Sequence, residues 1–383
     1  MEKKTFNPVK NSRRKFSNFQ QKEVANQPDD YSMVVFCHLR WGFVYQRPQH
    51  IISRIAKSRK VLFVEEPVHF EQGEEDTFEL EKITPNLHVF KPKVREIEGI
   101  QKVLKPLLKN QEIEIGWFYS ASFSPLITEF KFNTVVYDCM DELSLFKGAP
   151  IQLITQEKFL LSEAHVVFTG GKSLFESKRK EHNNVHCLPS SVDRKHFERA
   201  MGEIEIPSDI KNIKHPIIGY FGVIDERIDL DLLRDAARLQ PDMAFVMIGP
   251  LAKIGPDDLP YEPNIYYLGM KSYQELPNYL RAFDMAMMPF ALNDATKYIS
   301  PTKTLEYMAA GKPIISTAIK DVVRDYSHCI SIIKTAEEFS EKAEEIWKVY
   351  QPDNSEVYND ILNNTSWDAT AEKMTQQIKL KVV

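Results

Sequence analysis

The sequence has no apolar run near the roughly 18 residues that a membrane-spanning helix requires. Its amino end also has no apolar core of the kind that a secretion signal carries. Neither sign of charge dominates, because the formal net charge of the 383 residues is −5, which argues against a general nucleic-acid-binding surface. We therefore expect a cytoplasmic protein that binds no nucleic acid.

Cysteine is scarce, and its spacing excludes two kinds of site. The four residues are far apart, with no CxxC pair and no Cys/His cluster of zinc spacing: Cys37, Cys139, Cys187 and Cys329. Buried reduced thiols are expected, not a disulfide framework. No GxGxxG motif opens a strand–helix–strand unit, which disfavours a dinucleotide-dependent oxidoreductase.

The first thirty residues are polar and mostly basic. The basic residues are Lys3, Lys4, Lys10, Arg13, Arg14, Lys15 and Lys22. This composition predicts a disordered, solvated tail over residues 1–30. The alternative is a weak anchor on anionic lipid, to which each basic residue near the surface contributes about 1 kcal/mol.

Short apolar runs alternate with amphipathic segments through the rest of the chain. The runs predicted as strands in the first half are 33–39, 60–66, 86–90, 115–120, 134–140, 165–170 and 184–189. Those in the second half are 216–224, 243–249, 264–269, 284–290, 313–317 and 329–334. Helical spacing between many of them indicates parallel sheets with helices on both faces.

The alternation stops at residues 200–215, a charged stretch with no clear period, which indicates a linker. We therefore predict an α/β protein with two doubly wound, Rossmann-like domains that face each other across a cleft. The predicted domains are 31–208 and 209–350, followed by a carboxyl-terminal segment, 351–383. Ligands bind beyond the carboxyl ends of parallel strands, so two such domains make one deep site.

The segment ISPTKTLEYMAAGKPIIST, residues 299–317, predicts a short helix. Ser300 is the expected N-cap, Pro301 the first helical residue and Gly311 the carboxyl-terminal stop.

Two charged residues share one face of this predicted helix. Lys303 and Glu306 are three residues apart. A helix start with Lys303 suits a diphosphate, and Glu306, one turn deeper, suits the two hydroxyls of a ribose. The alternative is an ordinary surface pair that contributes about 0.2–0.5 kcal/mol.

Neighbouring segments favour the ligand-binding interpretation. In GYFGVIDERID, Gly222 would let backbone approach a ligand and Arg227 would reach a diphosphate. Two further strands, in MIGP and YLGMKSY, also end with glycine at their carboxyl ends.

The second half resembles the nucleotide-sugar-binding domain of bacterial glycosyltransferases with the GT-B fold. The segments that carry this resemblance are GYFGVIDERIDLDLL, FVMIGP, NIYYLGMKSYQELPNYL, FDMAMMPF and ISPTKTLEYMAAGKPIIST. The first half is similar to the same lineage through FCHLRWGFVYQRPQH, VLFVEEPV, VYDCMDELSLF, VVFTGGKSLFESK and LPSSVD. The similarity is to the cell-surface polysaccharide and teichuronic-acid type, and it runs from about residue 31 to the carboxyl end.

The resemblance implies a last helix, anchored by Trp367, that crosses back to the first domain. It also implies that Glu306 binds the donor ribose and that Met270 and Tyr273 lie where the base packs. The implied diphosphate-binding helix start comprises Ser300, Pro301, Thr302, Lys303 and Thr304. Retaining families often carry two glutamates with seven residues between them, but here the first position is Tyr298, so donor sugar and stereochemistry stay open.

The segment LRWGFVYQRPQH supplies candidates in the first domain. Arg47, with Arg40, suits a phosphate or an acidic acceptor, and His50 suits a general base. The alternative is that Arg47 pairs with a carboxylate and His50 is an ordinary packed residue.

Carboxylates lie at the end of the predicted strand 134–140 and just after it. Asp138, Asp141 and Glu142 are close enough in sequence to raise one another's pKa, which suits a general base, Asp141 with Asp138. The alternative is helix capping by Asp141.

Two other segments of the first half leave two interpretations open. FTGGKSLFE, residues 168–176, has glycines that suit either an anion site or a tight turn. Residues 97–110 form an amphipathic pattern, which indicates a helix packed on the sheet or, alternatively, a membrane-docking helix.

The sequence therefore predicts a glycosyltransferase that moves a sugar from a nucleoside diphosphate sugar to a surface polysaccharide or lipid-linked acceptor. The expected donor is a UDP-sugar. No DxD-like acidic pair stands in a context that demands a metal, so we expect no metal and no cofactor. Contact with the inner face of the cell membrane is a further expectation. The rival functions are a nucleotide-sugar epimerase and a non-catalytic sugar-nucleotide-binding protein.

Overall fold

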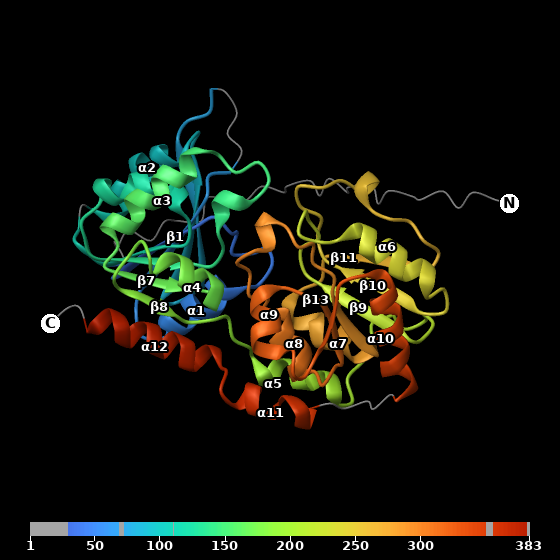
Figure 1. Ribbon diagram of the computed structural model, residues 1–383. Coiled ribbons are helices and arrows are strands. Elements are labelled where there is room, and N and C mark those ends of the chain that lie inside the picture. Colours follow the sequence, from blue (N-terminus) through green and yellow to red (C-terminus); the bar gives the residue numbers. More distant parts are fainter. Residues whose placement is uncertain (1–29, 69–72, 110, 350–354, 381–383) are drawn as a thin grey trace.

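The computed structural model describes residues 30–68, 73–109, 111–349 and 355–380. They form two lobes that lie next to each other, each built on one sheet (Figure 1). The tail predicted for residues 1–30 lies, apart from Asp30, outside the described residues.

The first sheet has eight strands in the order β3-β4-β2-β1-β5-β6-β7-β8. Their bounds are β1 Met33–Cys37, β2 Val61–Glu65, β3 Thr77–Thr84, β4 Leu87–Lys93, β5 Ile113–Phe118, β6 Phe132–Cys139, β7 Val166–Thr169 and β8 Val185–Cys187. All neighbours pair in parallel except β3, which pairs antiparallel with β4. The sequence did not predict β3, because this edge strand is largely exposed and carries few apolar residues.

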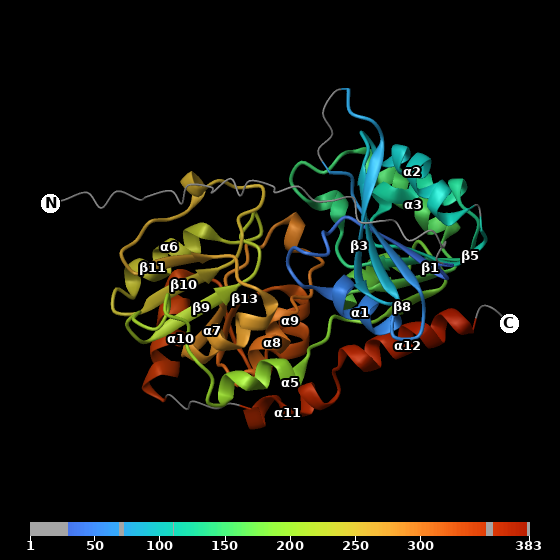
Figure 2. The same cartoon turned by 180° about the vertical axis from the view of Figure 1, so that it is seen from behind.

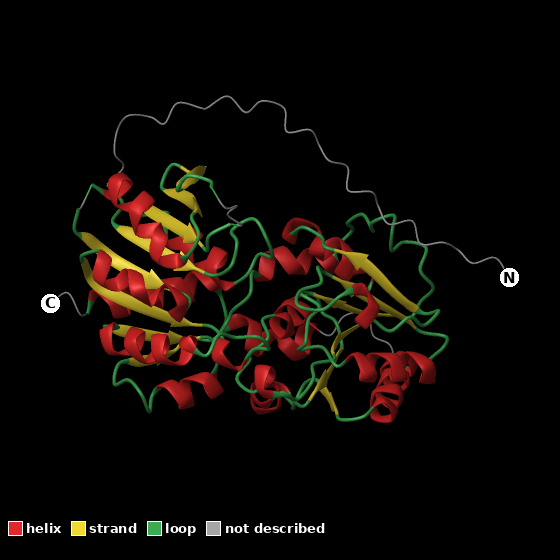
Figure 3. Cartoon of the chain, turned by 90° about the horizontal axis from the view of Figure 1, so that it is seen from above, coloured by secondary structure: helices red, strands yellow, loops and turns green. Residues whose placement is uncertain are grey.

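Helices cover both faces of this sheet (Figure 3). One face carries α2 (Ile100–Leu108), the 3-10 helix Ala121–Glu129 and α3 (Gln152–Glu163), and the other carries α1 (Arg47–Ile55). The apolar side chains of α2, among them Ile100, Leu104 and Leu108, are buried in the core. The amphipathic pattern of residues 97–110 therefore belongs to a packed helix, and its apolar face cannot dock on a membrane.

The second sheet has six strands in the order β11-β10-β9-β12-β13-β14, and all its pairs are parallel. The strands are β9 Ile217–Phe221, β10 Ala244–Ile248, β11 Ile265–Gly269, β12 Met285–Met288, β13 Ile314–Thr317 and β14 Ser331–Ile333. The helices between and after them are α6 Leu230–Leu239, α7 Leu276–Ala282, α8 Lys303–Ala309, α9 Lys320–Tyr326 and α10 Ala336–Lys348. Helices cover both faces of this sheet, so its strands are continuous apolar segments. These segments made the sheet predictable from the sequence.

The core of the second lobe begins earlier than the predicted boundary at residues 208/209. Val192, Phe197, Ala200 and Ile210 pack into it, with Phe197 at the end of α5 (Arg194–Phe197). Much of the predicted linker is therefore attached to the second domain.

The carboxyl-terminal helices connect the two lobes. In α11 (Ser355–Asn363), Tyr358 and Leu362 pack into the second core. In α12 (Trp367–Lys379), Trp367 and Met374 pack into the first core (Figure 2). The chain thus returns to the first lobe between residues 363 and 367.

Candidate functional site

A cavity of about 970 Å³ lies between the two lobes. Loops at the carboxyl ends of β1, β2, β5 and β6 line it on one side, and loops after β9 and β10 line it on the other. Among the lining residues are His38, Glu66, Ser122, Asp141, Phe146, Asp225, Arg227 and Lys253. This is the place where ligands of parallel sheets are expected.

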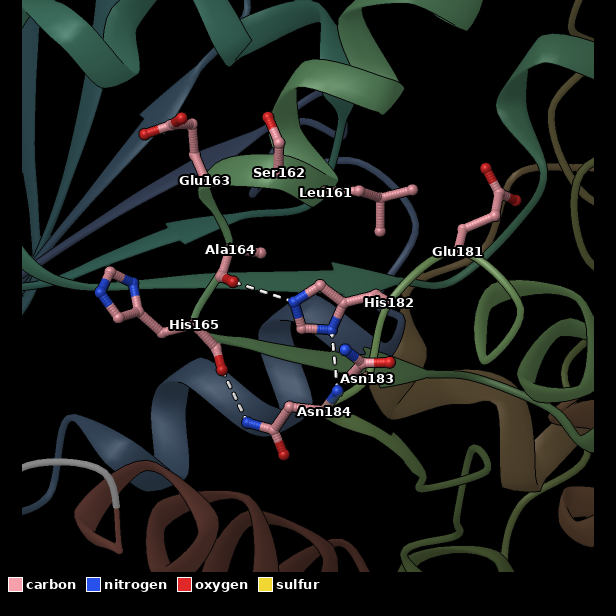
Figure 4. A pocket seen from close by; sticks show the side chains of 9 residues that line it. All are labelled: Leu161, Ser162, Glu163, Ala164, His165, Glu181, His182, Asn183 and Asn184. Atoms are coloured by element: carbon pink, nitrogen blue, oxygen red, sulfur yellow. Dashed lines mark hydrogen bonds between the residues drawn. The ribbon is translucent and has the colours of Figure 1, made fainter.

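A second hollow, of about 560 Å³, is no comparable site (Figure 4). It lies where β7 and β8 begin, at the opposite end of the sheet. His182 Nε2 hydrogen-bonds the Ala164 carbonyl at 3.0 Å, and its Nδ1 accepts from the Asn184 backbone N–H at 3.1 Å. Both ring nitrogens of His182 therefore hold loops together.

The segment 299–317 forms α8, which begins later than predicted. The first helical residue is Lys303 and the N-cap is Thr302, whose side chain makes no capping bond. Ser300 and Pro301 are thus not the N-cap and first helical residue. Gly311 follows the helix with φ of 66°, which confirms the predicted stop.

Glu306 is a buried carboxylate without a protein partner. Its side chain makes no hydrogen bond or ion pair among the described residues, although the residue is only 7% exposed. Burial raises the pKa of Glu306 to about 7, and the nearby Lys303 ammonium opposes this rise. Because an unpaired buried charge is costly, such a group marks a candidate ligand site.

Lys303 lies one turn before Glu306 in α8, and its side chain lies against the backbone of Gly222, just after β9. Burial lowers the pKa of Lys303, Glu306 opposes this, and Arg227 lowers it further. A Cβ atom on Gly222, whose φ is 142°, would lie 2.2 Å from Lys303 Cε. The room that Gly222 leaves is therefore occupied by Lys303, which a side chain at residue 222 would displace.

Arg227 and Asp141 connect this helix to the cavity. Arg227 pairs with Asp225, with Nη2 and Oδ2 at 2.7 Å, and both line the cavity. Asp141 comes from the first lobe. Burial raises its pKa, and Arg227 and Lys303 oppose the rise. The cavity wall itself does not include Lys303 or Glu306, but Lys303 interacts electrostatically with Asp141, Asp225 and Arg227, which line it.

Asp138 and Arg47 are paired with each other, which corrects the expectation that they bind or activate a ligand. Arg47 Nη2 lies 2.9 Å from Asp138 Oδ1, and both side chains are almost fully buried. Arg47 Nη1 also donates to the Leu188 carbonyl at 2.7 Å. The alternative of a carboxylate partner for Arg47 is thus the observed one.

His50 is a packed residue and not a free base. Its ring stacks on Trp367 at 4.6 Å and meets the rings of Tyr45 and Tyr273 edge-on. Burial lowers the pKa of His50 to about 2. Tyr273 in turn stacks on His196 at 4.3 Å, so it lies in an aromatic cluster between the lobes.

Three other predicted residues are not part of the wall of the cavity between the lobes. Thr304 is fully buried, and its hydroxyl lies 3.4 Å from the Met288 sulfur. Arg40 hydrogen-bonds the Glu65 carboxylate and the carbonyl oxygens of Glu66 and Pro67. Met270 is exposed on the strand-end loop after β11.

The turn at Gly170 and Gly171 lies next to a negatively charged group, but this group is a carboxylate of the same chain and not a ligand. The Asp321 carboxylate, at the start of α9, accepts from the Ser173 backbone N–H at 3.0 Å. Ser173 is the second residue of α4 (Lys172–Lys178). A Cβ atom on Gly171 would lie 2.8 Å from both Asp321 Oδ2 and Ser300 Cβ, so the lobes touch here.

Two cavity residues were not predicted. His38 Nδ1 is buried without a hydrogen-bond partner, and burial, with Lys253 nearby, lowers the pKa of His38 to about 4. Burial also raises the pKa of Glu66, whose carboxylate interacts with the Ser122 hydroxyl. His38 is the last residue but one of the predicted strand 33–39 and Glu66 is the last of 60–66, and this position at a carboxyl end was the available signal.

In the part of the chain that the structure covers, no group of three or more His, Cys, Asp or Glu side chains is arranged to hold a metal ion.

Residues 215–348 match the family described as "Glycosyl transferases group 1". The chain is 24% identical over 293 residues to the "Putative teichuronic acid biosynthesis glycosyltransferase TuaH" of Bacillus subtilis (strain 168), which covers 68% of this chain and 70% of that one.

Solved structures with the same fold confirm the predicted GT-B architecture. Sucrose-phosphate synthase from Thermosynechococcus elongatus is similar with a TM-score of 0.72 and 13% identity, over 91% of this chain and 98% of that one. Anabaena Alr3699/HepE, in complex with UDP and glucose, is similar with a TM-score of 0.65 and 13% identity, over 91% and 99% of the two chains.

Proposed function

We propose that this chain, a glycosyltransferase of the GT-B fold whose residues 215–348 match a glycosyltransferase group 1 domain, uses a UDP-sugar as donor. The proposed acceptor is a surface polysaccharide or a lipid-linked glycan. The name of the B. subtilis relative, which refers to teichuronic acid biosynthesis, supports this class of acceptor. The UDP and glucose in the Anabaena structure support the class of donor.

The observation that carries the proposal is the pair Lys303 and Glu306. Glu306 is buried and Lys303 is partly buried, and neither side chain has a hydrogen bond or close ion pair within the described residues. We propose that Lys303 binds the diphosphate and that Glu306 accepts hydrogen bonds from the ribose hydroxyls. A bound donor would thus satisfy two groups that the protein leaves unsatisfied.

The proposed reaction forms a bond between an acceptor oxygen and the anomeric carbon, and breaks the bond from that carbon to the diphosphate. Lys303 and Arg227 stabilise the negative charge on the departing nucleoside diphosphate. Asp141, in the cavity wall, takes the proton of the acceptor hydroxyl. Because two cations stand at this position, we propose that transfer requires no metal ion.

Thermal unfolding with a panel of UDP, GDP, ADP, CMP and NAD, first without metal and then with Mg²⁺, tests the donor site. Selective stabilisation by one nucleoside diphosphate without metal is expected, since a ligand at 100 times its Kd adds about 2.7 kcal/mol. Lys303→Met should weaken this binding at least tenfold, whereas Lys214→Met, at an exposed site, should leave it unchanged.

Equal binding by the Lys303→Met variant and the parent would contradict the donor site. Product analysis then separates the rival functions. Release of nucleoside diphosphate that depends on an acceptor glycan supports transfer. Conversion of the UDP-sugar without acceptor would identify an epimerase, and binding without either reaction would identify a binding protein.

A further inference from the structure

A buried lysine of the first lobe binds two carboxylates that have no part in the reaction described so far. Lys178, the last residue of α4, is 1% exposed. Its Nζ lies 2.8 Å from Glu142 Oε2 and 2.7 Å from Glu157 Oε2, in α3 (Figure 1). Burial lowers the pKa of Lys178, but Cys139, Glu157 and Glu142 raise it further, so the pKa lies above its ordinary value. The ammonium group therefore stays charged between the two carboxylates.

Two side chains of β6 belong to the same group. Tyr137 and Cys139 lie on one face of the strand, because side chains two residues apart point to the same side of a sheet. The Tyr137 hydroxyl donates to Glu157 Oε1 at 2.6 Å, and the Cys139 thiol donates to the Asp141 carbonyl at 3.6 Å. We call Tyr137, Cys139, Glu142, Glu157 and Lys178 the Lys178 cluster.

The Lys178 cluster holds the segment that carries Asp141. Asp141 lines the interlobe cavity from the first lobe. Its carbonyl accepts the hydrogen bond from Cys139, and the next residue, Glu142, is bound by Lys178. Glu142 also accepts from the Ser144 hydroxyl at 3.3 Å. A buried ion pair thus connects the residue after Asp141 to α4.

The same segment meets cations of the second lobe. The centre of the Phe146 ring lies 4.6 Å from Lys253 Nζ and 5.4 Å from the guanidinium carbon of Arg227. Burial raises the pKa of Asp141, and the charges of Arg227 and Lys303 oppose this rise. The position of the Asp141 carboxyl relative to these cations therefore depends on how the first lobe holds the segment.

We propose that Lys178 is a positioning residue, which through Glu142 holds the Asp141 carboxylate where the acceptor hydroxyl loses its proton. Lys178 itself is not part of the cavity wall. Charge-assisted hydrogen bonds away from water suit this role, because they are short and directional and water does not compete for them. The task of Asp141 rests on the proposed function, whereas the anchoring of its segment does not.

Glu142→Leu tests the anchoring, because it releases the segment and leaves Lys178 paired with Glu157. Amide hydrogen exchange of residues 141–149 should become roughly tenfold faster than in the parent. The matched control is Glu114→Leu, which removes a carboxylate paired with Arg59 in β5 of the same lobe. Exchange of residues 141–149 should be the same in the control and the parent.

Turnover tests the positioning. It is followed as UDP release from UDP-glucose, UDP-galactose and UDP-N-acetylglucosamine, with water in place of the acceptor. Glu142→Leu should lower kcat roughly tenfold and change the KM for the donor by less than about twofold, whereas Glu114→Leu should change neither. The double variant Lys178→Met, Glu157→Gln, which leaves a single carboxylate in the cluster, should lower kcat to a similar extent.

A double-mutant comparison separates positioning from a general loss of structure. In the Asp141→Asn background, Glu142→Leu should lower kcat no further, because a positioning residue acts only through the group that it holds. An additive loss of kcat, a loss that appears only in KM, or unchanged exchange of residues 141–149 would each overturn the proposal.

The parent enzyme distinguishes failure of this proposal from failure of the proposed function. A parent that binds UDP but releases none from these donors would overturn the positioning role, because Asp141 would then take no proton. A parent without any nucleotide-induced thermal shift would refute the proposed function. Faster exchange of residues 141–149 in Glu142→Leu would in that case still support the anchoring by Lys178.

Discussion

At the scale of single residues, Glu306 has the most unusual environment in the candidate site. Its carboxyl group is buried, and burial raises its pKa to about 7 from the ordinary value of 4.5. The unfolded chain therefore loses this proton at a lower pH than the folded protein does. It follows that the charged form of Glu306 destabilises the fold, increasingly as the pH rises from about 4.5 to 7.

Glu306→Gln should increase the free energy of unfolding at pH 8 by roughly 1–3 kcal/mol, because the amide carries no buried charge. At pH 4.5 the gain should nearly vanish, since the folded parent is protonated there. Urea unfolding at both pH values measures the difference, with Glu181→Gln, at an exposed position, as the control. Equal stability of parent and Glu306→Gln at pH 8 would contradict the raised pKa.

The same variant should bind nucleoside diphosphate more weakly, because its amide oxygen is a poorer acceptor than a carboxylate. A gain in stability together with a loss of binding is what a residue kept for function shows.

At the scale of elements, α4 and α9 hold the two lobes together. Asp321 accepts hydrogen bonds from Ser173 at the start of α4. Around it, Lys172 pairs with Asp325, and Glu176 pairs with Lys320 and Arg324. Asp321 and Ser173 are buried, whereas the surrounding ion pairs are not, so these pairs contribute little and the contact of Asp321 with Ser173 is the important one.

Asp321→Ala should lower the free energy of unfolding by about 1–3 kcal/mol, because it leaves a buried donor unpaired. It should also loosen the lobes, which small-angle scattering of the nucleotide-free protein would record as a larger radius of gyration. The exposed Asp242→Ala serves as the control. An unchanged radius would show that α4 and α9 do not set the distance between the lobes.

At the scale of the whole molecule, α12 and an aromatic cluster join segments from both lobes. Trp367 of α12 stacks on His50 of the first lobe, and His50 meets Tyr273 of the second. Tyr273 stacks on His196, in α5. The cluster thus ties four segments that are distant in the chain.

Trp367→Ala should cost about 3–5 kcal/mol of stability, as large buried aromatic side chains do. Trp367→Phe, which preserves a ring against His50, should cost clearly less. Unfolding of the parent and of both variants in guanidinium chloride measures the two losses in the free energy of unfolding. A loss below about 1 kcal/mol in Trp367→Ala would mean that α12 is not anchored at this residue.

The sequence by itself determined the order of the elements and the place of the candidate helix. Buried strands form continuous apolar runs and amphipathic helices show their period, so both sheets, apart from the exposed edge strand β3, could be predicted from local pattern. Gly311 marked the end of α8, because it adopts a positive φ that few other residues tolerate. Lys303 and Glu306 could be grouped because a helical turn brings residues three apart together.

Only the tertiary structure decided which side chains are free and which are paired. Arg47 meets Asp138 across 91 residues, and Ser173 meets Asp321 across 148. No local period relates such positions, so the sequence offered Arg47, Asp138 and His50 as site residues although packing uses them. Contacts between distant segments depend on how helices and sheets pack, and the same packing left the buried Glu306 carboxylate without a hydrogen bond among the described residues.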